Sequence, residues 1–201
     1  MVDERLSTHE IPTGIILAGG KGTRVGGADK GLLHYCGRPL IHHMLDILNP
    51  VTNNIVVNCN RSDTEYARLG YPVVSDATQD FDGPLAGIVA AGQVSNSAML
   101  CVVPCDTPHL SSTVLSHLVV ELRHCDAVYA HDGQRPQPLV CALRRSCLPS
   151  MADYLHAGGR SAIGWFQHVR GREVRFSNPQ QFININQLDQ LDDSNNNHLR
   201  T

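Results

Sequence analysis

The sequence lacks the cysteine and histidine spacings that mark common disulfide scaffolds and metal sites. Its seven cysteines stand singly between Cys36 and Cys147 without a CxxC pair, and its eleven histidines include no HExxH motif. This pattern argues against a disulfide framework and a zinc site, and it favours a reducing cytoplasm as the location of the chain. Cys101 and Cys105 flank an apolar segment, so we predict core positions for both, the alternative being a ligand or nucleophile role.

No charge of one sign dominates the sequence, and no apolar run is long. Sixteen basic against nineteen acidic residues give a formal net charge of -3, so nothing global attracts the chain to nucleic acid or to an acidic membrane. The longest strongly apolar run is about the length of "AMLCVV", and residues 1–10 are polar, so we expect neither a signal peptide nor a membrane span. Any anion binding must therefore be local, and neither nucleic acid nor a membrane is expected as a partner.

The length and composition suit one α/β domain. The 201 residues, 42% of them hydrophobic, are enough to bury a normal core. We predict a single domain over residues 1–201, with an ordered core from about residue 11 to 191 and a polar tail over 192–201.

Strand and helix patterns alternate along the first two thirds of the chain. Short apolar runs predict strands at 13–18, 54–58, 71–76, 98–106 and 126–131, and helical spacing of apolar residues predicts helices at 38–49, 63–70, 84–94 and 111–124. Apolar strands separated by helices imply a mostly parallel sheet covered on both faces. The predicted fold is therefore a three-layer, Rossmann-like sandwich.

The order loosens after about residue 134. The patterns there predict strands at 137–143, 172–177 and 182–186 and a helix at 150–158. We expect this second half to lean over the first and to close the cleft.

The stretch "LAGGKGTRVGGADKG", residues 17–31, follows the first strand directly. Ligands of open α/β sheets bind beyond the carboxyl ends of the strands, so a ligand is expected here. The stretch is neither of two familiar phosphate motifs: GxGxxG would need glycine at Val25, and GxxxxGK[ST] would need Lys-Ser or Lys-Thr at Ala28 and Asp29. Its glycine N–H groups and its basic residues still predict an anion cradle, the alternative being a glycine-rich hairpin with incidental lysines.

The segment "VVPCDTPHL" ends an apolar strand at Asp106, with a proline on either side. A carboxylate held rigidly at the carboxyl end of a strand is well placed to bind Mg²⁺, which prefers one or two carboxylates together with phosphate oxygens. The alternative is that Asp106 caps the next helix, although Ser111 and Ser112 already suit that purpose. We therefore predict that Asp106 binds Mg²⁺ and faces the glycine stretch.

Asp76 and Asn58 end two further predicted strands at the same edge of the sheet. A carboxylate can accept hydrogen bonds from the N1 and N2 donors of guanine together, a pair that adenine and cytosine lack. Asp76 is therefore the candidate for base selection, and Asn58 could add an amide contact to the base or ribose. For each, the alternative is local turn formation.

A family resemblance rests on "LAGGKGTR", "GGADKGLL" and "GRPLI". These motifs resemble the nucleotidyltransferase superfamily and closely resemble the molybdenum cofactor guanylyltransferases, with Val25 where that family has methionine. "PCDTP" matches the metal-binding motif of the family. The resemblance covers about residues 13–191.

The resemblance implies an enzyme that transfers GMP from GTP to the terminal phosphate of molybdopterin or its molybdenum form, releasing pyrophosphate. Asp106 would hold Mg²⁺, and Arg24 and Lys30 would stabilise charge during the transfer. The implied GTP-binding residues lie in the glycine stretch and along the same edge of the sheet: Leu17, Ala18, Gly19, Gly20, Lys30, Asn58, Asp76, Pro84 and Leu85.

The second half carries weaker signals for the acceptor. Arg135 and Arg160 stand in the polar loops "HDGQRPQP" and "AGGRS", and "NINQLDQL" resembles the family's C-terminal motif, keeping Asn184 and Asn186 but losing its Thr-Pro. These four residues are the candidates for molybdopterin binding, the alternative being ordinary surface loops.

Two other kinds of function stay open from the sequence. One is the same fold with a different base or acceptor, either a cytidylyltransferase for the same cofactor or a sugar-phosphate nucleotidyltransferase. The other is a nucleotide-binding module without catalysis. The implied partners are GTP, molybdopterin and other proteins of molybdenum cofactor biosynthesis.

Overall fold

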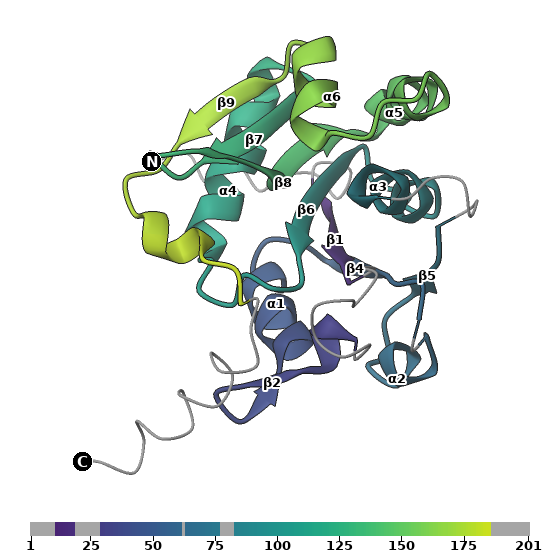
Figure 1. The fold of residues 1–201 in the computed structure, drawn as a ribbon, viewed down its shortest axis with the longest axis vertical. Helices are drawn as coiled ribbons and strands as arrows, with labels where there is room; N and C mark the ends of the chain where they lie inside the picture. Colours follow the sequence, from purple (N-terminus) through teal and green to yellow (C-terminus); the bar gives the residue numbers. More distant parts are fainter. Residues whose placement is uncertain (1–10, 19–28, 62, 77–82, 186–201) are drawn as a thin grey trace.

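A seven-stranded sheet forms the centre of the computed structural model. The structure describes residues 11–18, 29–61, 63–76 and 83–185 (Figure 1). The strand order is β5-β4-β1-β6-β8-β7-β9. The strands are β1 (Thr13–Leu17), β4 (Asn54–Asn58), β5 (Val73–Val74), β6 (Met99–Pro104), β7 (Ala127–His131), β8 (Pro136–Arg144) and β9 (Arg172–Arg175). Only β8 runs antiparallel to its neighbours within this sheet, which confirms the predicted mostly parallel arrangement.

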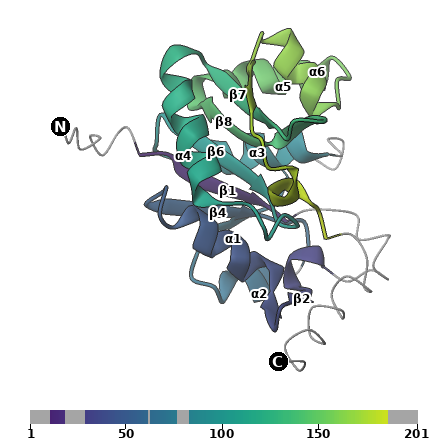
Figure 2. The same cartoon turned by 90° about the vertical axis from the view of Figure 1, so that its left-hand side faces the viewer.

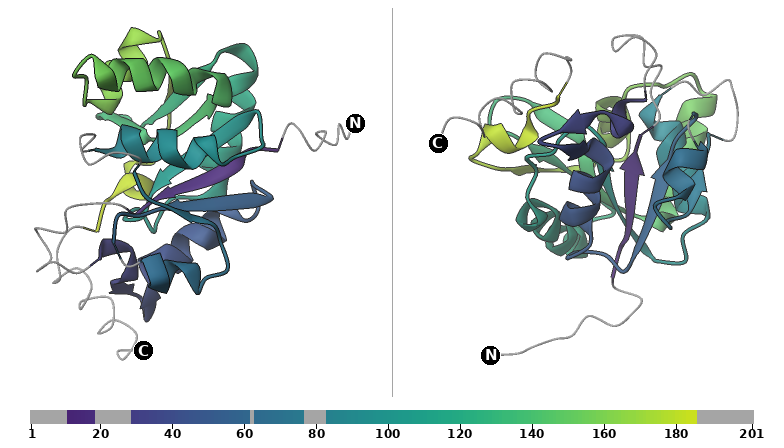
Figure 3. Two further views of the ribbon diagram at one scale, coloured as in Figure 1. Left: turned by 90° about the vertical axis from the view of Figure 1, so that its right-hand side faces the viewer. Right: turned by 90° about the horizontal axis from the view of Figure 1, so that it is seen from below.

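Helices cover both faces of the sheet. One apolar core joins a face of the sheet to α1 (Leu40–Leu48), α2 (Asp63–Ala67) and α4 (Ser112–Glu121). A second core joins the opposite face to α3 (Pro84–Gln93), α5 (Leu148–His156) and α6 (Ala162–His168). Figure 2 shows α1 and α4 on the near side of the sheet, and Figure 3 (left) shows α5 beside α3 on the other. The predicted three-layer sandwich is confirmed.

The sequence of β1 explains its central position. All five residues of "TGIIL" are buried, and consecutive residues point to opposite faces, so Ile15 lies in one core and Ile16 in the other. A strand that contacts helices on both faces needs apolar side chains throughout rather than alternation. β1 pairs with β4 on one side and β6 on the other, which aligns Leu17 with Asn58 and Pro104.

The cysteines are free thiols. Cys101 and Cys105 are both buried, in agreement with the predicted core positions. Burial raises the pKa of the Cys101 thiol to about 12 and raises that of Cys105 as well, so both stay protonated near neutral pH. Among the described helices, none combines the length and the apolar character that crossing a membrane requires.

The second half of the chain departs from expectation in two ways. It does not lean over the first half, because β7, β8 and β9 continue the same sheet. The strand predicted at 182–186 is wrong for its described part: a 3-10 helix, η4 (Pro179–Phe182), ends there, and Ile185 donates its N–H to the carbonyl oxygen of Asp106 instead of a strand partner, at 2.8 Å. The apolar side chains of "FININ" serve this docking, since Ile185 packs against Leu40.

The short helix α6 was not predicted, and neither were the two strands of a hairpin, β2 (His34–Tyr35) and β3 (Arg38–Pro39). The hairpin turn holds Cys36 and Gly37 at φ of 48° and 80°, a conformation that glycine adopts easily. The predicted tail and the boundary of the domain at 191 lie outside the described residues, so the single-domain interpretation stays a prediction.

Candidate functional site

The parallel strands end together at one edge of the sheet. Leu17, Asn58 and Pro104 are the last residues of β1, β4 and β6 and lie in register. Leu17 accepts a hydrogen bond from the backbone of Cys105 at 3.1 Å, and the next residue, Ala18, donates to the carbonyl of Asn58 at 2.8 Å. Residues at the start of the glycine stretch are therefore fixed between the two neighbouring strands, beside the segment that carries Asp106.

Lys30 and Asp106 form an ion pair at this edge. The ammonium Nζ of Lys30 donates to Oδ2 of Asp106 at 2.5 Å, and the two side chains are 24% and 13% exposed. An ion pair this well shielded is screened by salt less than an exposed one. The structure thus brings together two residues that are 76 positions apart and that sequence reasoning assigned to one site.

The second carboxylate oxygen of Asp106 fits a cation. Oδ1 is buried and has no hydrogen-bond partner in the part of the chain that the structure describes. An unpartnered buried oxygen is costly and is available to a hard metal ion. The described residues hold no cluster of three metal-binding side chains, so within that part of the chain Asp106 is not joined by two further metal-binding side chains.

Asp106 does not cap the following helix. Ser111 occupies the cap position of α4, and its hydroxyl accepts a hydrogen bond from the backbone of Thr113 at 3.2 Å. The carboxylate of Asp106 points to Lys30 instead. The structure therefore disfavours the capping alternative.

Lys30 lies in a short turn that hydrogen bonds of Asp29 and Tyr66 hold in place. Asp29 begins the short 3-10 helix η1 (Lys30–Leu32), and its carboxylate accepts a hydrogen bond from the backbone of Gly31 at 3.3 Å. The hydroxyl of Tyr66, on α2, donates to the same carboxylate oxygen. Sequence reasoning missed both Asp29 and Tyr66 as site residues.

Asp76 lies in a network of amides. Its Oδ1 accepts a hydrogen bond from Asn58 at 2.9 Å, and its Oδ2 accepts one from Asn60 at 2.7 Å. The side-chain oxygen of Asn60 in turn accepts from the backbone N–H of Asp76 at 2.9 Å. Asn60 was not predicted, although it follows Asn58 by two residues and so lies just beyond the end of β4. This network fixes the orientation of the Asp76 carboxylate.

The start of α3 lies next to this network. Gly83 precedes the helix at φ 140°, and Pro84 opens it. Pro84 has no N–H, and the side chain of Leu85 is a fully buried hydrocarbon without a donor, so of these two residues only Leu85 could donate a hydrogen bond to a ligand, through its backbone N–H. A Cβ added to Gly87 would lie 2.1 Å from Oδ1 of Asn58, so glycine is needed for this close approach.

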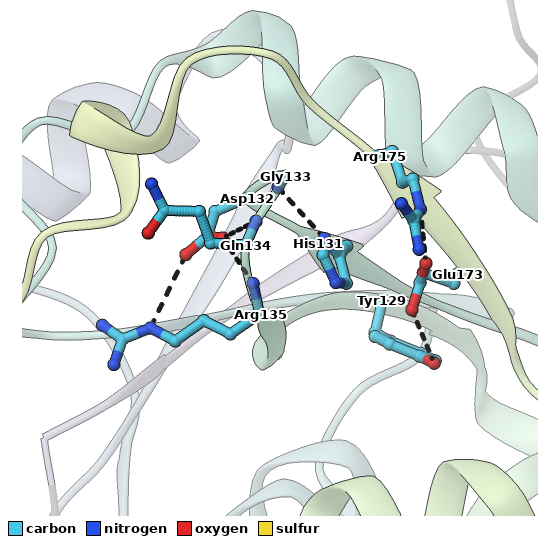
Figure 4. A network of polar contacts seen from close by, with 8 residues as sticks. All are labelled: Tyr129, His131, Asp132, Gly133, Gln134, Arg135, Glu173 and Arg175. Atoms are coloured by element: carbon cyan, nitrogen blue, oxygen red, sulfur yellow. Dashed lines mark hydrogen bonds and ion pairs between the residues drawn. The ribbon is translucent and has the colours of Figure 1, made fainter.

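The loop that holds Arg135 joins β7 to β8 at the same edge (Figure 4). Asp132 organises it: Oδ1 accepts from the backbone of Gln134 and Arg135, both at 2.8 Å, and Oδ2 accepts from Gln137 at 2.7 Å. Burial raises the pKa of Asp132, but these hydrogen bonds outweigh it and lower the pKa below its ordinary value. The side chain of Arg135 is 72% exposed and lies 3.6 Å from the Asp132 carboxylate.

The other acceptor candidates are placed in different ways. Arg160 is exposed, and its guanidinium donates to the carbonyls of Leu155 and Gly159 at the end of α5, each at 2.8 Å. Asn184 directly precedes Ile185, whose N–H donates to the backbone carbonyl of Asp106 at 2.8 Å. Gly19, Gly20, Arg24 and Asn186 lie outside the described residues.

The model of the MobA-like NTP transferase domain family matches residues 14–171. The chain belongs to this family. It is 38% identical over 179 residues to the molybdenum cofactor guanylyltransferase of Serratia proteamaculans, covering 89% of this chain and 91% of that protein. It is 39% identical over 178 residues to the protein of the same name from Pasteurella multocida, covering 87% of this chain and 94% of that protein. The chain is accordingly a nucleotidyltransferase, as the sequence motifs predict.

Solved structures agree on the fold of this transferase family. Molybdopterin-guanine dinucleotide biosynthesis protein A from Archaeoglobus fulgidus gives a TM-score of 0.74 at 23% identity, over 94% of this chain and all of that one. A 4-diphosphocytidyl-2C-methyl-D-erythritol synthase from Anaerococcus prevotii gives 0.75 at 13% identity, over 96% and 97% of the two chains. At these identities the likeness concerns the fold, which is shared by proteins named for different bases and acceptors.

Proposed function

We propose that this nucleotidyltransferase moves GMP from GTP to the terminal phosphate of molybdopterin or its molybdenum form and releases pyrophosphate. Its relatives at 37–39% identity carry the name molybdenum cofactor guanylyltransferase. The observation that supports the proposal most directly is the Lys30–Asp106 pair, with a buried carboxylate oxygen left for a cation beside the glycine stretch. A nucleotide-binding module without catalysis has no need of that arrangement.

To catalyse this reaction, the chain mainly has to position the two substrates and stabilise the charge on their phosphates. An oxygen of the acceptor phosphate forms a bond to the α-phosphorus of GTP, and the bond from that phosphorus to the β-phosphate oxygen breaks, so that pyrophosphate leaves. The acceptor phosphate is already ionised at neutral pH, and no general base is required. Arg24 and Lys30 stabilise the charge on the transferring and leaving groups, and the backbone N–H groups of Gly19 and Gly20 cradle the phosphates.

Asp106 is the proposed Mg²⁺ ligand. Bound there, Mg²⁺ would neutralise phosphate charge and help to align the triphosphate. Lys30 pairs with the other carboxylate oxygen of Asp106, Oδ2. The carboxylate is thus oriented before the substrate arrives.

The nucleotide and the acceptor are proposed to occupy neighbouring parts of the same edge. Asp76 reads guanine with Asn58 beside it, while Leu17, Ala18, Pro84 and Leu85 line the nucleotide. Arg135, Arg160, Asn184 and Asn186 are the proposed acceptor contacts. Location in a reducing cytoplasm, and association with other proteins of molybdenum cofactor biosynthesis, stay predictions.

One assay tests this function. The purified chain is incubated with GTP, Mg²⁺ and molybdopterin, and pyrophosphate release is measured with and without the metal. CTP in place of GTP, and sugar 1-phosphates in place of molybdopterin, test the two related activities. Faster turnover with either would overturn the assignment of base or acceptor, and nucleotide binding without pyrophosphate release would indicate a binding module.

The role of Asp106 has a matched control. Asp106→Asn keeps the size of the side chain but removes its charge, so we expect kcat to fall by about 100-fold or more. Asp46→Asn removes a carboxylate from an exposed ion pair with Arg38 and should leave kcat unchanged. Both variants should fold, which thermal unfolding checks. An Asp106→Asn variant with full Mg²⁺-dependent activity would contradict the assigned role.

A further inference from the structure

We infer that Tyr66 is a positioning residue: its hydroxyl anchors the turn of Asp29 and Gly31 and thereby holds Lys30 against Asp106. The inference rests on the proposed function, since it concerns the geometry of that same site. Tyr66 lies on α2, outside the glycine stretch and outside the motifs that carry the family resemblance.

The contacts of Tyr66 reach the turn on both sides of Lys30. The side chain of Tyr66 is fully buried in the core beneath α1 and α2, and its hydroxyl donates to Oδ1 of Asp29. The same oxygen of Asp29 accepts from the backbone of Gly31 at 3.3 Å. One buried hydroxyl therefore fixes the carboxylate that closes the turn, and Lys30 is the residue between the two ends.

The Tyr66 hydroxyl lies very close to Gly31. A Cβ added to Gly31 would lie 2.4 Å from the Tyr66 hydroxyl oxygen and 3.3 Å from the ring carbon that bears it. Contacts below 3.0 Å cannot form without a shift, so either the turn or the ring would have to move. The turn is thus packed directly on the hydroxyl, with no side chain at Gly31 to keep them apart.

The hydroxyl stays a donor over the working pH range. Burial raises the pKa of Tyr66 far above its ordinary value, and the hydrogen bond to Asp29 raises it further. The anchor therefore does not switch with pH near neutrality. Lys30, at the opposite end of the chain of contacts, donates to Asp106 at 2.5 Å.

A merely structural tyrosine would be expected to affect stability but not catalysis. Tyr66→Phe removes only the hydroxyl and keeps the ring in the core. If the hydroxyl positions Lys30, we expect kcat to fall by about tenfold or more while KM for GTP changes by less than about threefold, since a small misplacement of a charged group acts mainly on the transition state.

Tyr71→Phe is the matched control. Tyr71 also packs against this core, but its hydroxyl donates to Asn49 at 3.5 Å, away from the Lys30 turn. Tyr71→Phe should leave kcat and KM unchanged. Equal kcat in Tyr66→Phe, Tyr71→Phe and the unmodified chain would overturn the inference.

A second readout does not depend on activity. The chain has lysines only at positions 21 and 30, so mass spectrometry of peptides reports the acetylation rate of each separately. Loosening the turn should raise the rate at Lys30 severalfold relative to Lys21 in Tyr66→Phe and not in Tyr71→Phe. If the unmodified chain transfers no GMP, the proposed function fails, and this ratio still decides the inference.

Gly31→Ala gives an independent test from the other side of the contact. Its methyl group would push on the hydroxyl, so kcat should fall and Lys30 acetylation should rise. Adding Gly31→Ala to Tyr66→Phe should change kcat and Lys30 acetylation little further, because the 2.4 Å contact between the added methyl group and the Tyr66 hydroxyl is then absent. A folded Gly31→Ala variant with unchanged kcat and acetylation would overturn the inference, as would full additivity of the two substitutions.

Discussion

Asp76 shows how the partners of a single residue limit what it can recognise. A carboxylate has about four acceptor positions, and the amides of Asn58 and Asn60 take one on each oxygen. Each oxygen therefore keeps one acceptor position, so the carboxylate can accept two further hydrogen bonds in total. The pair of donors on guanine matches that capacity, while the two amides prevent the carboxylate from turning away.

Asp76→Asn should reduce the preference for GTP. An amide offers one acceptor and one donor where the carboxylate offers two acceptors, so one of the guanine donors would lose its partner. A lost hydrogen bond to a charged group is worth about 1.5–3 kcal/mol, so kcat/KM for GTP relative to ITP, which lacks the 2-amino donor, should fall about 10- to 100-fold. Competition between the two nucleotides in one reaction measures the ratio.

Asn60→Ala is the control for orientation without loss of the carboxylate. It removes the amide on Oδ2 of Asp76 and should raise KM for GTP and ITP together, leaving their ratio within about threefold. An unchanged ratio in Asp76→Asn would move base selection to the backbone.

At the scale of the element, α3 has two glycines, and each allows a close contact with a different part of the molecule. Gly87 faces Asn58, where an added Cβ would lie 2.1 Å from the side-chain oxygen. Gly92 is near the other end of the helix, and there an added Cβ would lie 2.8 Å from a methyl group of Leu148 and 2.9 Å from one of Leu100. The first contact belongs to the hydrogen-bond network of Asn58 and Asp76, and the second belongs to the core between α3 and α5.

Alanine at these two positions should separate affinity from stability. Gly87→Ala should displace Asn58 or the start of α3 and raise KM for GTP about tenfold or more, as expected for loss of a hydrogen-bonded network. Gly92→Ala overpacks the core and should lower the free energy of unfolding by about 1–3 kcal/mol with little change in KM. Urea unfolding and GTP titration of both variants measure the two effects. A normal KM in Gly87→Ala would contradict the role of the Asn58 contact.

Most elements could be predicted because their apolar patterns are strong. The strands at the centre of the sheet are buried on both faces, and α1 repeats buried residues at helical spacing, from Leu40 through Met44 to Leu48. The segment 182–185 could not be predicted, because alternating apolar residues suit a strand and a docked segment equally. Only the position of Asp106 in space decides that Ile185 bonds there.

Some residues of the candidate site could likewise be predicted from the sequence, and others could not. The predicted strand ends led to Asn58, Asp76 and Asp106 as candidates, since the carboxyl edge of a parallel sheet can be located from sequence. Asn58 does end β4, whereas β5 and β6 end two residues before Asp76 and Asp106. Tyr66 looks like any buried aromatic residue of a short helix, and its contact with Asp29 spans 37 positions. Long-range contacts of this kind have no local signal.

At the scale of the whole molecule, the two apolar cores contain most of the thiols. Cys101 and Cys105 lie in the first core, and Cys141 and Cys147 lie in the second. Burial raises the pKa of Cys101 from an ordinary 9.0 to about 12 and that of Cys147 to about 11. The folded chain therefore holds these thiols neutral at a pH where the unfolded chain ionises them.

Stability should consequently fall at alkaline pH. The contribution of each such thiol is fully present below pH 9 and is lost as the pH rises toward its folded-state pKa, because the unfolded chain releases the proton first. At pH 10 the loss is about 1.4 kcal/mol for each buried thiol whose pKa exceeds 11. Urea unfolding at pH 7.5 and pH 10, under reducing conditions, measures the difference. Cys101→Ala should reduce it by about one such step. An equal loss in Cys101→Ala and the unmodified chain would show that other groups, such as Tyr66, carry the alkaline instability.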